Sequence, residues 1–453
     1  MLNAHNGRSL RSALPHGTVS PGLEGLMRIL HVIKGCPFPP RGGVESDVWN
    51  RLLAMRNLGY GLHVVMTTGK TPPDATRVGE IRKAAERVDL VPRSRSLSSI
   101  FTADPTLVAT NRTLMSLPLE GEYELALADS EFLTPIFDNP RLRARLRVVR
   151  VHNDESRYFW TMAKAEKQPH WKALFALEAV RFRWFSRRQF GKVDGIWFIS
   201  TSERDRVSLE YPELRSKSYW IPAAIDLRAG QRRTETQMAS REVLIVGTLN
   251  GSLNQEGIRW HIQHVHPILQ EDPTYRLTIA GGTRGWARAR RFADEICGTD
   301  RCEVHLDRAD LCPLYSRAGV VVNPMQRGAG VKLKTIHAVL EGRPLVTTST
   351  GADGSGFRNR DHIRIEDDPT RFAKAIQDIF DYPEAAKRMT DRAHRYLLDH
   401  YNQEVQIQRF LTDRLTALID GRSHTAPLSS PDERTLKGSN EAGERRIANA
   451  RRF

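Results

Sequence analysis

The segment that most constrains the fold of this chain is Asn323–Gly354, NPMQRGAGVKLKTIHAVLEGRPLVTTSTGADG. It follows the apolar run Val320–Val322, which is typical of a short buried strand, and it begins with a loop that contains glycines. A short helical pattern then ends at Gly342, with Pro344 just beyond it, and Leu345–Thr348 is typical of a second strand. Strand, glycine loop, helix and strand form a βαβ unit, in which ligands bind beyond the carboxyl ends of the strands.

The loop of this unit carries Gly328, Gly330, Lys332 and Lys334. Glycines let backbone N–H groups come close to a phosphate, and the N-terminus of the following helix favours negative charge. The two lysines add positive charges that suit a diphosphate. We therefore predict a diphosphate site here; the alternative is a tight turn with solvated lysines.

A similar unit opens the chain. Arg28–Ile33 is typical of a strand, Pro37–Gly43 of a loop, Glu45–Leu58 of a helix and His63–Thr67 of a second strand. This order indicates a doubly wound α/β fold. The Gly-Gly pair that ends the loop is weak evidence by itself, because most such pairs are simply turns.

Polar residues directly follow the predicted strand Arg147–Val151, in the order His152, Asn153, Asp154. Side chains in this position lie at the ligand-binding edge of such a sheet. A histidine there is able to polarise an acceptor hydroxyl or to hydrogen-bond a sugar oxygen. The alternative is that the loop only caps the next helix, through Asn153 or Asp154.

These segments together resemble retaining glycosyltransferases of family 4. The GxGxKxK run at 328–334, the GRPLVTT run at 342–348 and the GADG run at 351–354 look like that family's donor-binding segment. The HNDES run at 152–156 is similar to a segment of exopolysaccharide-type members. The resemblance covers about Met27 to Leu418, and it implies the α/β GT-B architecture, with two Rossmann-like domains facing each other across a cleft.

The resemblance and the composition of the ends imply a division of the chain into six parts. The C-terminal end mixes Ser, Pro, Gly and charged residues without apolar periodicity, which predicts disorder. We expect a disordered tail at 1–26, an acceptor domain at 27–227, a linker at 228–241, a nucleotide-sugar domain at 242–385, helices at 386–420 that pack back toward the first domain, and a disordered basic tail at 421–453.

The resemblance also implies the site residues, with His152 as the catalytic residue. The donor-binding residues would be Gly43, Gly247, Gly328, Gly330, Lys332, Lys334 and His337. His337 stands where most members carry a glutamate that holds the donor's ribose, and Ala329 stands at a second position that is acidic in many members. An imidazole is able to donate to, or accept from, a ribose hydroxyl. The arginine that many members direct at the donor phosphates is not assigned to a residue here.

The composition is that of a soluble globular protein, with 40% apolar and 27% charged residues. No apolar run approaches the roughly 18–20 residues that span a bilayer, and the first 25 residues lack the apolar core of a signal peptide. We therefore expect a cytoplasmic protein. The four cysteines, Cys36, Cys297, Cys302 and Cys312, lack zinc-ligand spacing and are expected to be reduced thiols.

The formal net charge of +15 favours acidic partners. No nucleic-acid-binding motif is present, so we predict no nucleic-acid partner. Residues 157–192 interleave aromatic with basic side chains, a mixture that suits the head-group layer of an anionic membrane. The alternative is that these aromatics belong to the core and the basic residues to a solvated face.

We therefore predict a glycosyltransferase (hexosyltransferase type, EC 2.4), cytoplasmic and peripheral on the inner face of the membrane. It would move a sugar from a nucleotide-sugar donor to a glycan or lipid-linked acceptor. The resemblance implies retention of configuration and neither a cofactor nor an obligatory metal, and no DxD acid pair follows a predicted strand. The alternatives are a nucleotide-sugar epimerase and a GT-B scaffold that has lost catalysis.

Overall fold

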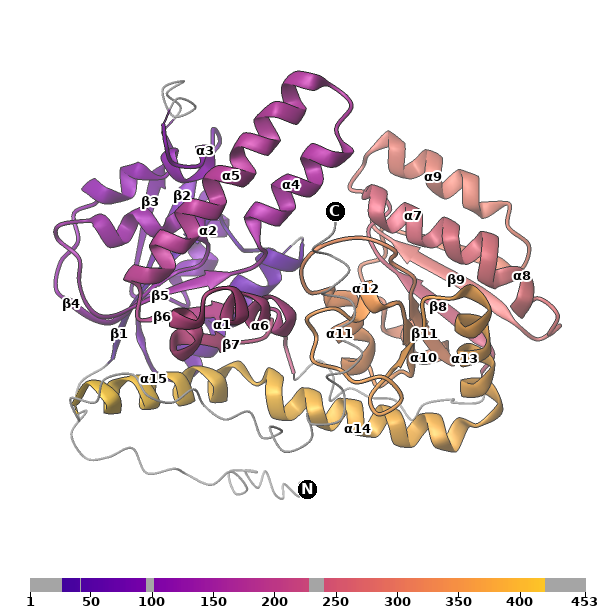
Figure 1. Cartoon of the computed structure of the whole chain (residues 1–453). Helices are drawn as coiled ribbons and strands as arrows, with labels where there is room; N and C mark the ends of the chain where they lie inside the picture. Colours follow the sequence, from indigo (N-terminus) through magenta and orange to yellow (C-terminus); the bar gives the residue numbers. More distant parts are fainter. Residues whose placement is uncertain (1–26, 41, 95–101, 228–239, 420–453) are drawn as a thin grey trace, which may run out of the picture.

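The structure, a computed structural model, describes residues 27–40, 42–94, 102–227 and 240–419. These residues form two α/β domains that lie side by side (Figure 1), and each is built on a parallel sheet. The predicted pair of Rossmann-like domains is confirmed. The predicted tails at 1–26 and 421–453, and most of the predicted linker at 228–241, lie outside the described residues.

The N-terminal domain contains the larger sheet, in the strand order β3-β2-β1-β4-β5-β6-β7. Its strands are β1 (Arg28–Lys34), β2 (Gly61–Thr68), β3 (Arg87–Pro92), β4 (Glu122–Ala128), β5 (Arg143–Val151), β6 (Gly195–Phe198) and β7 (Ser218–Trp220). Its helices are α1 (Gly43–Asn57), α2 (Ala75–Arg82), α3 (Thr106–Ala109), η2 (Arg112–Ser116), η3 (Glu131–Asp138), α4 (Glu155–Ala165), α5 (Pro169–Lys192), α6 (Thr201–Glu210) and η4 (Pro212–Lys217).

The C-terminal domain contains the second sheet, in the order β10-β9-β8-β11-β12-β13. Its strands are β8 (Glu242–Val246), β9 (Arg276–Gly281), β10 (Cys302–Leu306), β11 (Val320–Asn323), β12 (Leu345–Thr347) and β13 (Arg364–Ile365). The helices are α7 (Ser252–Trp260), η6 (His261–Val265), α8 (His266–Leu269), α9 (Ala287–Cys297), α10 (Cys312–Arg317), α11 (Leu333–Leu340), α12 (Ser349–Ala352), α13 (Pro369–Asp381), α14 (Pro383–Tyr401) and α15 (Gln403–Ile419).

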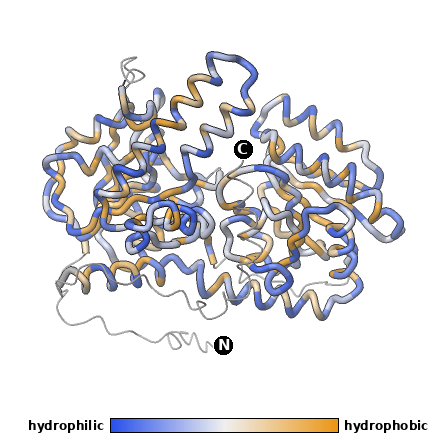
Figure 2. Tube along the Cα trace, viewed as in Figure 1, coloured by the Kyte–Doolittle hydropathy of each residue, from blue (hydrophilic) through white to orange (hydrophobic). Residues whose placement is uncertain are grey.

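The central strands are continuous apolar runs because helices cover both faces of a parallel sheet. All eight residues of β2 and all four of β11 are buried. Figure 2 shows the hydrophobic residues gathered on the strands inside both domains. The four cysteines carry free thiols, and Cys36 is buried.

Residues 157–192 lie on two helices, α4 and α5. The chain leaves α4 after Ala165 and starts α5 at Pro169. A proline lacks the N–H that a helix interior requires but fits a first turn, so it begins the second helix. The carboxylate of Asp154 caps α4 by accepting from the Arg157 N–H at 2.9 Å, so the capping role considered for this loop is present.

The last two helices cross from one domain to the other along the base of the molecule in Figure 1. Residues of α14 such as Leu397 belong to a core cluster of the C-terminal domain. Phe410 of α15 instead packs edge-on against Trp197 of β6, with 5.1 Å between the ring centroids. Gly195 of β6 makes room for this ring, since a Cβ there would lie 2.8 Å from Phe410 Cζ.

Candidate active site

The predicted site residues come from the points where the strand order of each sheet reverses. The reversal falls between β1 and β4 in the first sheet and between β8 and β11 in the second. Loops at the carboxyl ends of the strands leave a crevice at such points, and ligands bind in it. Gly43 follows β1, Gly247 follows β8, and the glycine–lysine loop follows β11.

The glycine–lysine loop (328–334) contacts the N-terminal domain directly after β5. Gly328 and Gly330 have φ values of 135° and 72°, which favour glycine. A Cβ at Gly330 would clash with Asn153 Oδ1, so the close approach of the two domains also requires a glycine there. Ala329 is exposed at the tip of the loop. The predicted donor loop therefore faces the predicted acceptor loop.

Lys332 holds the shape of this loop. It is only 7% exposed, and its ammonium donates to the carbonyl oxygens of Gly328 at 2.9 Å and Gly330 at 2.5 Å. Burial lowers the pKa of Lys332, although the negative charges of Asp353 and Glu203 act to raise it. The buried cation is thus placed inside the loop that is predicted to receive a diphosphate.

Lys334 lies against Gly247. Its ammonium donates to Asn254 Oδ1 at 2.8 Å, and a Cβ at Gly247 would lie 3.5 Å from it. Burial, helped by the nearby charge of Lys332, lowers the pKa of Lys334 to about 8. Within the described ranges neither lysine forms an ion pair, so both charges are available to an anion.

Gly43 and His337 are the other two predicted donor-binding residues near the start of α11. Gly43 begins α1, and a Cβ there would lie 3.0 Å from Leu333 Cδ1, so the Gly-Gly loop meets the start of α11. His337 is half-buried further along α11, and burial lowers its pKa, which keeps the imidazole neutral at neutral pH. The contact of either residue with a donor remains a prediction.

Arg284 is a cleft residue that the sequence did not single out. It lies in the loop after β9, and its guanidinium reaches the Gly-Gly loop: a Cβ at Gly42 would lie 3.3 Å from Arg284 Nη2. Its φ of 51° is unusual for a residue with a side chain. The only signal in the sequence is its position just after the Gly281-Gly282 turn.

His152 belongs to a buried network of hydrogen bonds. Its Nε2 lies 2.9 Å from Asp129 Oδ1, and His31 Nε2 lies 2.7 Å from Asp129 Oδ2. Burial alone would raise the pKa of Asp129, but Arg51 and the two histidines hold it well below its ordinary value. The ring of His152 is therefore oriented by an ionised carboxylate.

The second nitrogen of His152 also points into the protein. His152 Nδ1 is buried, has no hydrogen-bond partner among the described residues, and lies 3.6 Å from Asp47 Oδ2. In this structure neither ring nitrogen is offered to the cleft, so the catalytic role of His152 remains a prediction.

Asp47 connects three parts of the N-terminal domain. Arg150 binds its carboxylate with two hydrogen bonds of 3.1 Å, Arg51 donates to it one turn along α1, and the Ala224 N–H donates at 2.6 Å. Asp47, Asp129 and His152 have ligand atoms within 4.8 Å of one another. Two buried arginines already balance the two carboxylates, so this cluster lacks the negative charge that attracts a cation.

Comparisons with known proteins agree with this geometry. A family model described as Glycosyl transferases group 1 matches residues 240–381, which make up the donor-side domain. A Klebsiella pneumoniae protein, described as an uncharacterized 44.6 kDa protein in the cps region, is 26% identical over 387 residues, 84% of this chain and 97% of its own.

Solved structures show the same fold at low identity. TarM from S. aureus has a TM-score of 0.60 at 9% identity, with 86% of this chain and 99% of TarM covered. Anabaena Alr3699/HepE in complex with UDP and glucose has a TM-score of 0.55 at 13% identity, with 86% and 100% covered. Residues 240–381 therefore form a glycosyl transferases group 1 domain, and the chain is a glycosyltransferase with the GT-B fold.

Proposed function

We propose that this enzyme transfers a sugar from a uridine-diphosphate sugar to a hydroxyl of a glycan or lipid-linked acceptor, with retention of the anomeric configuration. The observation that carries the proposal is the convergence of Lys332, Lys334 and the Gly-Gly loop where the two sheets face each other. Related folds support the choice of ligand, because HepE was solved with UDP and glucose and a TarM variant with UDP and α-GlcNAc-glycerol. The cps-region relative supports a polysaccharide as the product.

In the proposed reaction the acceptor oxygen bonds to the anomeric carbon while the bond from that carbon to the diphosphate breaks. The electron pair of the broken bond goes to the diphosphate, and the acceptor proton leaves with it or passes to water. The chain must then stabilise the charge that develops on the leaving diphosphate. Lys332, Lys334 and loop N–H groups would do this without an obligatory metal or cofactor, and Arg284 is placed to add a third cation.

We propose that His152 is catalytic and acts on the acceptor hydroxyl or on a sugar oxygen in the cleft. Its backbone carbonyl lies 3.6 Å from the Cβ position of Gly330, so the histidine stands beside the donor loop. Asp129 fixes the ring on its inner side. A small ring rotation on substrate binding would be needed to offer a nitrogen to the cleft.

The comparisons favour the transferase over the epimerase and the inactive scaffold, since the matching domain is a glycosyl transferase domain. The close approach of the glycine–lysine loop to Asn153 of the N-terminal domain supports a ligand site between the two domains. Ala329 is exposed at the tip of the loop, and burial lowers the pKa of His337, which favours its neutral form.

The proposal predicts that a uridine-diphosphate sugar raises the thermal midpoint of the purified protein. A ligand present at a hundred times its Kd stabilises the folded state by about 2.7 kcal/mol, which corresponds to a rise of about 5–10 °C for a domain of this size. The measurement is thermal unfolding with UDP-, GDP-, ADP- and dTDP-linked sugars over a concentration series.

Lys334→Met should remove most of this rise, while Lys374→Met, which changes an exposed lysine on α13, should leave it intact. If no nucleotide sugar stabilises the protein at saturating concentration, the donor site is inactive and the scaffold alternative holds. Conversion of the donor into an epimeric nucleotide sugar without an acceptor product would instead favour the epimerase.

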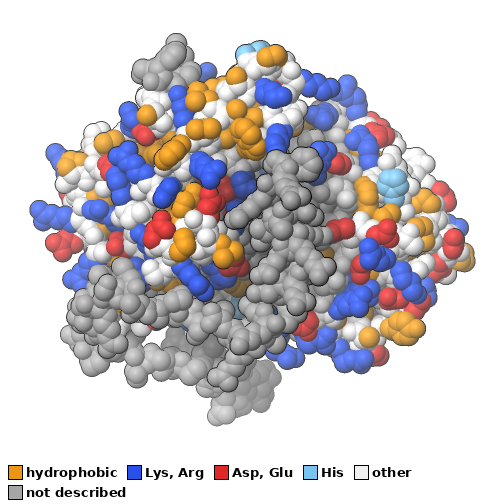
Figure 3. Space-filling view, viewed as in Figure 1, with side chains coloured by type: hydrophobic (Ala, Val, Ile, Leu, Met, Phe, Trp, Pro, Cys, Tyr) orange, Lys and Arg blue, Asp and Glu red, His pale blue; other side chains and the backbone are white. Residues whose placement is uncertain are grey.

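We also propose that the α4–α5 hairpin binds an anionic membrane on the cytoplasmic face. Among the described residues no helix is both long and apolar enough to cross a bilayer. The structure divides the aromatics of 157–192: Phe182, Phe185 and Phe190 are core residues, while Trp160, Trp171 and Trp184 are exposed, Trp184 by 70%. Figure 3 shows hydrophobic and basic side chains together over this projecting hairpin. Exposed tryptophans beside lysines and arginines suit the head-group layer.

Replacing Trp160 and Trp184 by serine is expected to weaken binding to vesicles that contain phosphatidylglycerol. Both rings lie on the exposed side of the hairpin, so the fold should persist. Co-sedimentation with anionic and with neutral vesicles measures the effect, and Trp286→Ser, an equally exposed tryptophan of the C-terminal domain, is the control. Equal sedimentation of wild type with both vesicle types would contradict a membrane role for the hairpin.

A further inference from the structure

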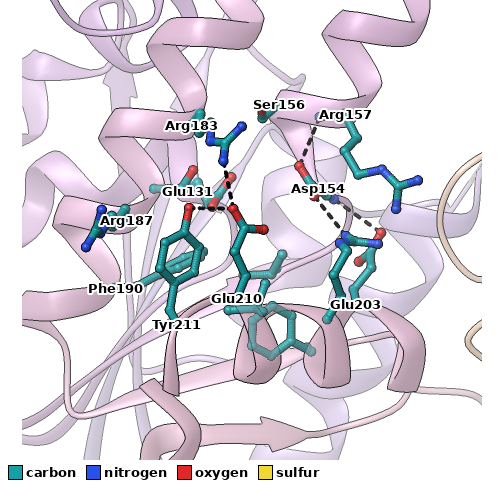
Figure 4. Close-up of a pocket in the computed structure, with 15 residues that line it drawn as sticks. Glu131, Asp154, Ser156, Arg157, Arg183, Arg187, Phe190, Glu203, Glu210 and Tyr211 are labelled. Carbon is teal, nitrogen blue, oxygen red and sulfur yellow. Dashed lines mark hydrogen bonds and ion pairs between the residues drawn. The ribbon is translucent and has the colours of Figure 1, made fainter. Parts of the chain in front are cut away.

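A cavity of about 300 Å³ lies in the N-terminal domain between α5 and α6 (Figure 4). Its walls include Glu131 of η3, Arg187 and Phe190 of α5, Glu203 of α6, and Tyr211. A volume of this size is at the lower limit for small-molecule sites, so it suits a single sugar residue rather than an oligosaccharide.

The cavity adjoins the cleft on the acceptor side. Val151 lines it, and the next residue is His152. Asp154 also lines it, and its N–H donates to Glu203 Oε1 at 3.2 Å. The helix that carries Glu203 meets the C-terminal domain, where the Thr201 N–H donates to the Gly354 carbonyl at 3.3 Å. The cavity is therefore lined by residues on both sides of His152 in the chain, Val151 and Asp154.

Glu131 is a buried carboxyl group without a full set of partners. It is 4% exposed, and its Oε2 has no hydrogen-bond partner in the part of the chain that the structure describes. Burial, with a contribution from Glu155, raises its pKa well above the ordinary value, which favours the protonated form of the carboxyl group. A neutral carboxyl at the wall of a cavity is able to donate a hydrogen bond to an oxygen of a ligand.

Four arginines and four carboxyl groups line the cavity, and two of each form ion pairs with each other. Arg183 pairs with Glu210 at 3.0 Å, and Arg206 pairs with Asp154 at 2.8 Å. Burial raises the pKa of Glu203, the remaining acid besides Glu131, to about 7. The ion pairs thus account for two of the four lining arginines.

The other two arginines stand on opposite sides of the cavity in Figure 4. Arg187 lies over the ring of Tyr211, with 5.1 Å from its guanidinium carbon to the ring centroid, and Arg157 extends from the start of α4. Among the described residues neither forms an ion pair. Both are exposed, so their guanidinium groups are free to close on an anion.

We propose that this cavity binds a sugar of the acceptor that bears an anionic group, a carboxylate or a phosphate, with Arg187 pairing with the anion and Glu131 donating to a ligand oxygen. The proposal rests on the proposed glycosyltransferase function and names the class of its acceptor. Tyr211 and Phe190 supply the apolar surface against which a sugar ring packs.

Ligand-detected NMR titrations of glucuronic acid, glucose 6-phosphate and glucose test this assignment. We expect at least one of the two anionic sugars to bind at least tenfold more tightly than glucose. Binding of glucuronic acid alone would assign a uronic acid, and binding of glucose 6-phosphate alone would assign a phosphorylated sugar. Equal binding of all three sugars, or no binding, would overturn the proposal.

Arg187→Gln should weaken binding of the anionic sugar at least tenfold, because it removes a charge-assisted hydrogen bond. Arg188→Gln, on the neighbouring position of the same helix and outside this cavity, should not. If the two changes weaken binding equally, the anionic sugar is attracted only by the positive charge of the surface. That result would overturn the proposed site. Glu131→Gln, which keeps a neutral donor, should retain binding, while Glu131→Ala should lose it.

The donor series with UDP-linked sugars, measured on the same variants, separates this proposal from the proposed function. If the nucleotide sugar stabilises Arg187→Gln as it does wild type while the anionic sugar no longer binds, both proposals stand. If the nucleotide sugar binds and no anionic sugar does, only the acceptor assignment fails. If no nucleotide sugar binds wild type, the proposed function fails, whatever the cavity does.

Discussion

An asparagine in place of Asp47 is expected to lower the free energy of unfolding by about 3–5 kcal/mol, because the two buried arginines would be left with the single carboxylate of Asp129. Arg51 and Arg150 are fully buried, and both donate to the Asp47 carboxylate. Burial already lowers the pKa of Arg150 to about 10, which shows how poorly this site tolerates an unbalanced guanidinium. The Ala224 N–H would also lose its charged acceptor.

Urea unfolding followed by tryptophan fluorescence measures this loss, since Trp197 lies in the same domain core. The matched control is Asp391→Asn, which breaks an exposed pair with Lys387 and should change stability by about 1 kcal/mol or less. The double change Asp47→Asn with Arg150→Met should recover part of the loss. A loss no larger than that of the control would show that the Asp47 network does not stabilise the domain.

Lys332→Met is expected to lower kcat/KM for the nucleotide sugar by about 10²–10³-fold, the usual cost of one preorganised group that stabilises developing charge. Lys332 is 7% exposed and its ammonium is held by two carbonyls of the glycine–lysine loop, so it needs little reorganisation when a diphosphate arrives. Methionine keeps the length of the side chain without its charge. Initial rates with wild type and variant give the ratio.

Lys374→Met serves as the control for a lysine removed from the surface of the same domain. The thermal midpoint of Lys332→Met without ligand should fall somewhat, because the carbonyl oxygens of Gly328 and Gly330 lose their donor, so the rates are compared at a temperature at which the variant is folded. A rate within threefold of wild type would show that Lys332 only shapes the loop.

Lys334 should make donor binding at this site depend on pH. This dependence tests whether the charge of Lys334, rather than the shape of its side chain, binds the donor. Its pKa of about 8 means that the ammonium loses its proton as the pH rises from 7 to 9. A neutral amine no longer attracts the diphosphate, so donor affinity should fall up to about tenfold per pH unit above 8. Lys334→Arg stays charged over this range and should remove the dependence.

Much of the donor side was predictable from sequence. The βαβ pattern of Asn323–Gly354 gives β11, α11 and β12 in the expected order, and the helix ends just before Gly342, whose φ is 67°. The glycines and lysines of this loop lie together because they are close neighbours in the chain. Local periodicity and turn chemistry were sufficient here, since hydrogen bonds within a few residues set the backbone.

The acceptor side was less predictable. The Asp47 network joins residues about a hundred or more positions apart, such as Arg150 and Ala224, so no spacing in the sequence shows it. The contacts of the Gly-Gly loop with Leu333 and Arg284 also join residues far apart in the chain, so no spacing in the sequence shows them. Arg51 and Arg150 were not singled out from sequence, because their burial depends on contacts between segments far apart in the chain.

The sequence by itself determined the class of fold and the chemistry of the glycine–lysine loop, because apolar periodicity and turn residues act over a few positions. Only the tertiary structure decided which of the aromatics in 157–192 are core and which are exposed. It alone brought Glu131 and Arg187 to one cavity and turned both nitrogens of His152 inward. Those outcomes depend on how the helices pack on the sheets and how the two domains meet. Both are set by contacts between residues far apart in the chain.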